Sequence, residues 1–199
     1  MRQIPNKRAW KKGLAELFDD QKANRIISRA QSIYLEYCGS CAREAGRANR
    51  NALMARILPA LSLYHVLLAE GMDQEEALSH LDCLFRRVFF TKRMQGIRVL
   101  NHLPNPFTIV RPLMKWMIKD DYLPGSQEIV EDNVDCLAVK VYHCFIFDAL
   151  TTYGAKELTP LFCNTDDWLA AELPSINWER TKTLGRGGDY CDFRWSRKI

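Results

Sequence analysis

Apolar residues recur at intervals of three and four along the first part of the chain, and this spacing is typical of amphipathic helices. The pattern predicts helices from residue 9 to about residue 70, where Gly71 is a suitable terminator. Asp73 followed by Glu76 is a capping-box arrangement, so we expect a further helix to begin there. The apolar side of that helix consists of Ala77, Leu81, Leu84, Phe85, Val88 and Phe89.

Three prolines, Pro104, Pro106 and Pro112, interrupt the segment that follows, from residue 91 to residue 126. The apolar residues after Pro106 fit a short helix, and residues 122–126 are typical of a turn. We therefore expect this segment to connect the helical part of the chain to a part of mixed structure.

The periodicity changes to two after Glu128, which indicates a β-strand. A strand over residues 134–144 places His143 on its apolar face and Cys144 on the opposite face. Because neighbouring residues of a strand point to opposite sides, we do not expect these two side chains to serve one centre.

Two short helices and a final hairpin complete the pattern, over residues 145–153, 157–173, 177–184 and 190–195. The predicted fold is α+β, with an N-terminal helical part packed on a small C-terminal antiparallel sheet that carries one or two helices. We place the helical part at residues 1–126 and the mixed part at residues 127–199, within one compact domain overall.

Composition changes this picture little. Of the 199 residues, 47% are hydrophobic, and the net charge is +4, so a core is expected and broad disorder is not. Basic residues gather at Arg43, Arg47 and Arg50 without interleaved aromatic residues, which favours a solvated helix face over a nucleic-acid site. We find no apolar stretch of the ~20 residues that cross a bilayer and no export signal, and we expect a cytoplasmic protein.

Seven cysteines, an odd number without the spacing of a disulfide framework, indicate reduced thiols. Cys38 and Cys41 form a C-x-x-C pair inside a helical segment, where buried thiols are favoured over a metal or redox site. A zinc site built from Cys144, Cys163 and Cys191 lacks the close cysteine pairs that structural zinc sites contain, so we predict no metal.

Cysteine, histidine and carboxylate side chains, which are suited to acid–base and nucleophilic chemistry, collect in the last third of the chain. Cys163 and Asp166 are three residues apart on a predicted helix and therefore share a face. A carboxylate disfavours a neighbouring thiolate, and a cationic substrate relieves that repulsion when it binds. The alternative interpretation is a buried helix cysteine near acidic residues at a solvated edge.

Cys191 shares its predicted strand face with Phe193 and Trp195, which is typical of core packing. The glycine-rich turn before it contains Gly187 and Gly188, and it can either expose backbone N–H groups to a carboxylate or serve as a simple hairpin loop.

Several short motifs follow one another in this region. In order, they are the strand ending in Cys144, Tyr153–Leu158, Phe162–Cys163 with Asp166, Arg180–Leu184, and Gly187–Phe193. In order and spacing they resemble the L-2-amino-thiazoline-4-carboxylic acid hydrolase family, over roughly residues 135–195. The resemblance implies a hydrolase that acts on a non-peptide C–N bond of a small cyclic amidine. Its substrate is then a cyclic isothiourea carrying a carboxylate, and its product a carbamoyl-cysteine.

The chemistry of that reaction suggests roles for the residues at these positions. We assign Asp166 to the amidinium of the substrate, Cys163 to the nucleophile and His143 to a proton carrier. If Cys163 is not the nucleophile, attack by water with Asp166 as general base is the preferred alternative. The substrate-binding set is Arg180, Arg194, Gly187, Gly188, Asp189, Cys144 and Cys191, with an arginine and the glycine turn on the substrate carboxylate.

A looser likeness to the vinyl-reductase-type ligand-binding domain supports an alternative, a non-enzymatic small-molecule-binding or sensing domain of the same fold. A metal-holding protein is a third and weaker alternative. We expect a small-molecule partner, no cofactor, no nucleic acid and no membrane, and homo-oligomerisation stays open.

Overall fold

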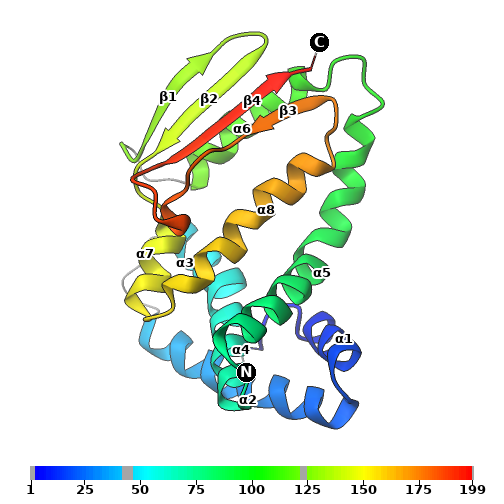
Figure 1. Ribbon diagram of the computed structural model, residues 1–199, viewed down its shortest axis with the longest axis vertical. Coiled ribbons are helices and arrows are strands. Elements are labelled where there is room, and N and C mark those ends of the chain that lie inside the picture. Colours follow the sequence, from blue (N-terminus) through cyan, green and yellow to red (C-terminus); the bar gives the residue numbers. More distant parts are fainter. Residues whose placement is uncertain (1–2, 42–46, 122–124, 199) are drawn as a thin grey trace. The chain divides into compact units, whose positions relative to one another are not determined.

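The computed structural model describes residues 3–41, 47–121 and 125–198 (Figure 1). The chain forms two compact units, residues 1–91 and residues 92–199, and the boundary falls within one long helix. The division after residue 126 stays a prediction. The side chains of Cys41, Arg43 and Arg47, and part of the turn expected at residues 122–126, lie outside the described residues.

The first unit is helical, as the apolar spacing predicts. Its elements are α1 (Lys7–Leu17), α2 (Asp20–Cys41), α3 (Arg47–Ala52), the π-helical turn η1 (Leu53–Ile57), α4 (Leu58–Ala69) and the first part of α5 (Gln74–Leu100). Gly71 follows α4 with φ of 92°, a value that glycine adopts without strain. Asp73 caps α5 by accepting the main-chain N–H of Glu76 at 2.8 Å, as the capping box predicts.

The segment Asn49–Ala69 corrects one expectation from the sequence. Its length of 21 residues and its mean hydropathy of 1.6 are sufficient for a membrane-crossing helix by composition alone. Sixty-one per cent of the apolar window is buried within the protein, as in the core helix of a globular unit. Leu58, Leu61 and Leu67 are fully buried, so the apolar side chains of this segment pack in the interior of the protein.

The second unit contains a four-stranded antiparallel sheet in the order β1-β2-β4-β3 (Figure 1). The strands are β1 (Gln127–Asp132), β2 (Cys136–Val141), β3 (Ile176–Glu179) and β4 (Cys191–Arg197). The α+β class and the final hairpin are therefore confirmed. Strand β1 was not predicted, and the strand expected over residues 134–144 spans only Cys136–Val141. The strand expected over residues 177–184 ends at Glu179.

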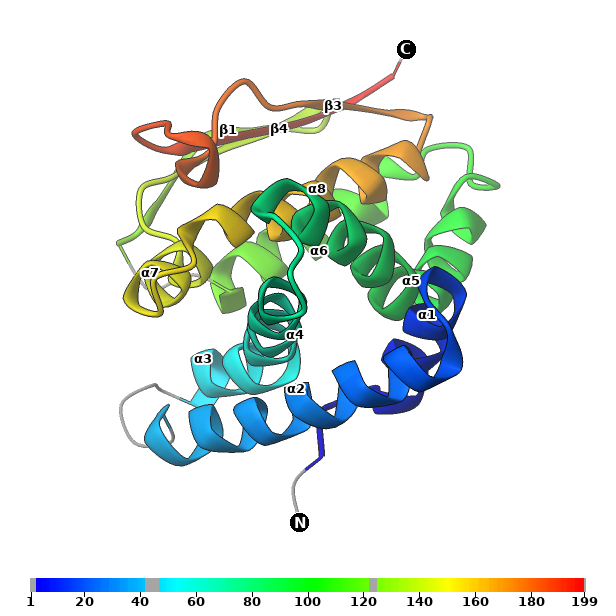
Figure 2. The same cartoon turned by 60° about the horizontal axis from the view of Figure 1, so that its bottom comes forward.

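The helices of this unit are α6 (Phe107–Asp121), α7 (Phe145–Thr152) and α8 (Thr159–Ala171), with short 3-10 turns η2 (Lys156–Leu158) and η3 (Leu184–Arg186). Figure 2 shows α6 and α8 on the same side of the sheet. Alternate residues of β2 and β4 face these helices and are buried, because successive strand side chains point to opposite faces.

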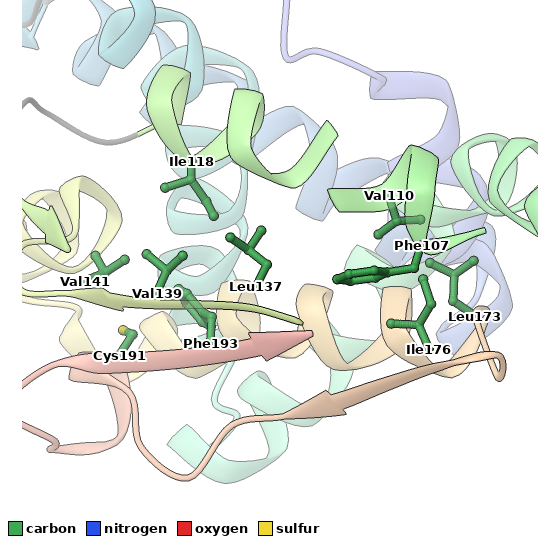
Figure 3. Packing of buried hydrophobic residues seen from close by; sticks show 10 residues of the cluster. All are labelled: Phe107, Val110, Ile118, Leu137, Val139, Val141, Leu173, Ile176, Cys191 and Phe193. Atoms are coloured by element: carbon green, nitrogen blue, oxygen red, sulfur yellow. The ribbon is translucent and has the colours of Figure 1, made fainter. Parts of the chain in front are cut away.

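Figure 3 shows this core, in which Phe107 and Val110 of α6 point towards the sheet. Cys191 and Phe193 of β4 belong to the same cluster, as the alternation predicts. The core fixes the start of β4 and the connection that precedes it relative to the covering helices.

Candidate active site

Three cysteines mark the place where α7, α8 and β4 begin. Cys144 is the N-cap residue of α7, Cys163 lies in the second turn of α8, and Cys191 is the first residue of β4. Pro160 occupies the first turn of α8, where its missing N–H costs nothing. The connection from β3 to β4 returns across this region and includes η3.

The sulfur of Cys163 lies against this connection. A Cβ atom built on Gly185 would be 3.1 Å from the Cys163 sulfur, so the glycine backbone approaches the thiol closely. Burial raises the pKa of the Cys163 thiol, and the negative charge of Asp166 adds to that rise. A hydrogen bond from Thr183 and the positive charges of Arg180 and Arg186 oppose it. The resting thiol is therefore protonated at neutral pH.

The other two cysteines are less suited to reaction. Burial raises the pKa of Cys144 to about 11, although the main-chain N–H groups of Ile146 and Phe147 favour its thiolate. Burial raises the pKa of Cys191 to about 12, and the main-chain N–H of Leu184 donates to its sulfur at 3.3 Å. Within the part of the chain that the structure describes, no group of three His, Cys, Asp or Glu residues is arranged to hold a metal ion.

A basic cavity of about 260 Å³ opens in the connection between β3 and β4. It is lined by Arg180, Thr181, Lys182, Thr183, Arg186, Gly187 and Gly188, all of them from the β3–β4 connection. Three cations line a volume of small-molecule size, and none of the lining residues is acidic. The cavity is therefore suited to an anionic group, and a carboxylate on a small substrate fits it.

Arg180 is mostly committed to α8. Its side chain is only 3% exposed and donates to the Cys163 carbonyl at 3.0 Å and to the carboxylate of Asp167 at 2.5 Å. A longer contact of 3.3 Å joins it to Asp166. We expected Arg180 to hold a substrate carboxylate, and the structure instead gives it a set of internal acceptors.

Arg186 is the cation that the sequence analysis missed. Its side chain is 49% exposed, and it donates to Asn164 at 2.9 Å and to Asp167 at 3.4 Å. Lys182, on the same cavity wall, pairs with the exposed carboxylate of Asp189 at 3.3 Å. In the sequence, Lys182 and Arg186 are recognisable as basic residues on either side of Gly185.

The glycine turn does not offer its backbone as expected. The main-chain N–H groups of Arg186, Gly187 and Gly188 donate to carbonyls of Thr183 and Leu184 within the turn, at 2.9 to 3.1 Å. Gly187 has φ of 86°, which explains why glycine occupies it. Those three N–H groups are already used within the turn, so the cavity wall offers a ligand its side chains.

The connection is further tied down by Asp192. Its carboxylate accepts the main-chain N–H groups of Thr181 and Lys182, at 2.9 and 2.7 Å, and the Thr181 hydroxyl. The side chain therefore holds the first residues of the cavity wall against β4.

Two predicted site residues lie elsewhere. Arg194 points to the face of the sheet opposite the core and pairs with Glu131 at 2.7 Å and with Glu179 at 3.9 Å. His143 is exposed in the connection between β2 and α7, because β2 ends at Val141 before reaching it. Neither residue lines the cavity. The structure thus brings together Cys144, Cys163, Cys191 and Arg180, with the glycine turn, and leaves these two outside.

No curated protein and no solved structure shows significant similarity to the chain. The family model described as L-2-amino-thiazoline-4-carboxylic acid hydrolase matches residues 50–195, which is most of the chain. The match includes the whole of the cavity wall, α7 and α8, and it reaches further towards the N-terminus than the motifs alone indicated. The chain therefore belongs to the L-2-amino-thiazoline-4-carboxylic acid hydrolase family.

Proposed function

We propose that the basic cavity of the β3–β4 connection is the substrate site of this hydrolase and that Cys163 is its nucleophile. The family hydrolyses L-2-amino-thiazoline-4-carboxylate to N-carbamoyl-cysteine, a reaction at the amidine carbon of a small cyclic isothiourea. The side chains of Arg186 and Lys182 bind the substrate carboxylate, and Asp166, which is 41% exposed on α8, meets the cationic amidine.

One observation carries this assignment. The three groups that favour the thiolate of Cys163, namely Thr183, Arg180 and Arg186, all line the cavity. The same three side chains therefore favour the thiolate of Cys163 and line the basic cavity. Neither Cys144 nor Cys191 has this relationship, because only one cavity cation, Arg180, acts on Cys191 and none acts on Cys144.

The bound substrate activates the thiol. A cationic amidinium beside Cys163 offsets both the burial and the charge of Asp166, so the pKa of the thiol falls when the substrate arrives. This coupling explains how a cysteine that is protonated at rest can serve as a nucleophile. A thiol nucleophile also requires a reducing compartment, and a cytoplasmic location is part of the proposal.

The proposed reaction has two steps. The Cys163 thiol gives up its proton and its sulfur bonds to the carbon between the two nitrogens, and the ring C–S bond breaks as the ring sulfur leaves and is protonated. Water then adds to the same carbon, the bond to Cys163 breaks, and the thiol regains a proton. One oxygen replaces the ring sulfur, and the amidine C–N unit on which the hydrolase acts becomes the urea group of N-carbamoyl-cysteine, with both nitrogens retained.

The test is incubation of the purified protein with L-2-amino-thiazoline-4-carboxylate, with ring opening followed by mass spectrometry. We expect turnover by the wild type and its loss in Cys163→Ala and Asp166→Ala, while Cys83→Ala, an exposed cysteine of the other unit, stays active. Full turnover by folded Cys163→Ser would contradict the nucleophile assignment and favour attack by water with Asp166 as base. A ligand-induced rise in melting temperature without turnover would identify a binding domain.

A further inference from the structure

Thr159, the first residue of α8, has a buried hydroxyl without a hydrogen-bond partner among the described residues. The residue is 1% exposed, so water in bulk solution does not reach it. A buried hydroxyl left unpaired costs free energy, and most buried side-chain polar atoms in proteins are paired. Thr159 follows the N-cap residue Leu158, and its hydroxyl caps no main-chain N–H of α8.

The position of the hydroxyl relative to Cys163 explains why this cost is tolerated. Thr159 and Cys163 are four residues apart on α8 and therefore lie on one face of the helix. The Thr159 methyl carbon Cγ2 and the Cys163 sulfur both lie within 3.1 Å of one point beside the backbone of Gly185. In the resting protein the methyl carbon is therefore the terminal atom of Thr159 that faces this shared point, and the hydroxyl is turned elsewhere.

A rotation by about 120° around the Cα–Cβ bond of threonine can bring the hydroxyl to the position of the methyl group, while the methyl group moves to the position of the Cβ hydrogen. Threonine in helices populates two such rotamers, in contrast to valine, which keeps one. In the second rotamer the Thr159 oxygen takes the place that the methyl carbon holds now, at the point beside Gly185 that the Cys163 sulfur also approaches. The fold therefore contains a second candidate donor for that sulfur, in addition to Thr183.

We infer that Thr159 is a positioning residue for the reacting thiol, with its hydroxyl turning to donate a hydrogen bond to the Cys163 sulfur once the proton has left. The inference rests on the proposed role of Cys163. In the resting protein the sulfur is protonated and the hydroxyl stays unpaired, while in the reacting state both groups gain a partner. A hydrogen-bond donor that contacts a negative charge present only during the reaction stabilises the reacting state and not the resting state. Such a donor therefore accelerates the reaction.

The decisive experiment compares Thr159→Val with Thr159→Ser. Valine keeps the shape of the side chain and removes the unpaired hydroxyl, so the melting temperature should stay equal or rise. The kcat for L-2-amino-thiazoline-4-carboxylate should fall about tenfold or more, with KM little changed, since hydrogen bonds to charged groups have that magnitude. Serine retains the hydroxyl and should restore kcat to within about threefold of the wild type.

A second readout does not depend on turnover. The alkylation of Cys163 by iodoacetamide, measured on the peptide by mass spectrometry across the pH range, should shift towards higher pH by about one unit in Thr159→Val. The control is Thr108→Val, whose exposed hydroxyl bonds the carbonyl of Asn105 on α6 and lies outside the site.

Each outcome bears on the inference. An active wild type with an equally active and unshifted Thr159→Val would overturn it, and so would a valine variant that unfolds more easily, because the hydroxyl then has a structural partner. An inactive wild type would remove the proposed function, and the alkylation profile would still decide whether Thr159 acts on the thiol.

Discussion

The guanidinium of Arg180 donates to the main-chain carbonyl of Cys163 at 3.0 Å, so the β3–β4 connection is fastened to the helix that carries the candidate nucleophile. The same side chain pairs with Asp167 of that helix at 2.5 Å, and Asp167 also accepts the indole N–H of Trp178 at 3.0 Å. The cavity wall and α8 are therefore one hydrogen-bonded assembly, and changes in either are expected to affect both stability and substrate binding.

Arg180→Gln should lower the free energy of unfolding by about 2 kcal/mol, because it removes charge-assisted hydrogen bonds from a buried side chain. Urea denaturation measures the effect. The matched control is Arg98→Gln, which breaks the ion pair with Glu172 from a side chain that is 62% exposed and should cost less than about 1 kcal/mol. Equal losses in the two variants would refute the structural role of Arg180.

Gly185→Ala should reduce both stability and turnover. The added Cβ would be 2.6 Å from the Thr159 methyl carbon and 3.1 Å from the Cys163 sulfur, so one of them must shift. Overpacking of this kind costs about 1–3 kcal/mol, and a displaced sulfur slows the reaction. Gly39→Ala is the control, since its Cβ meets nothing within 4 Å and α2 should gain slightly in stability. A fully active and stable Gly185→Ala would argue against the close approach.

Arg186→Gln should raise KM about tenfold or more with a much smaller change in kcat, because the side chain is proposed to bind the substrate carboxylate throughout the reaction. Steady-state kinetics by mass spectrometry separates the two constants. Arg194→Gln tests the competing assignment from the sequence, and we expect it to leave KM unchanged, since Arg194 lies on the opposite face of the sheet. The reverse pattern would return the carboxylate-binding role to Arg194.

The buried thiol of Cys191 predicts a loss of stability at alkaline pH. Its pKa is about 12 in the folded protein against an ordinary value of 9.0, so the folded state holds the proton more tightly than the unfolded state. The stabilisation is complete below about pH 9 and is lost as the pH rises towards 12, by up to about 1.4 kcal/mol per pH unit. In Cys191→Ala the free energy of unfolding should fall less steeply over this range. Parallel curves for the two proteins would contradict the raised pKa.

Much of the fold follows from periodicity. The helices over residues 145–153 and 157–173 and the final hairpin are confirmed because their apolar residues are buried on one face, where the pattern has physical meaning. The strand β1 was missed for the converse reason. It is an edge strand with a bulge between Ile129 and Glu131, and Ile129 and Val130 are about half exposed, so no buried alternation marks it.

The site was predictable in its residue types and less so in its geometry. The sequence places Cys163 and Asp166 on one helix, and the structure agrees. It cannot distinguish Arg180 from Arg186, because which cavity-lining cation is buried against α8 and which is half exposed depends on the path of the β3–β4 connection. The hydrogen bonds within the glycine turn likewise cannot be predicted from the sequence, and they occupy the main-chain N–H groups that were expected to bind a carboxylate.

The hydrogen bonds that the Asp192 carboxylate accepts from Thr181 and Lys182 affect which ligands the cavity can select. Because the cavity wall is held by its own backbone and by this carboxylate, a ligand does not have to order the loop, and little conformational entropy is lost on binding. A wall that is rigid before the ligand arrives also cannot adapt to larger or longer molecules. Discrimination among cyclic carboxylates should therefore rest on size and shape, with a narrow range of accepted rings.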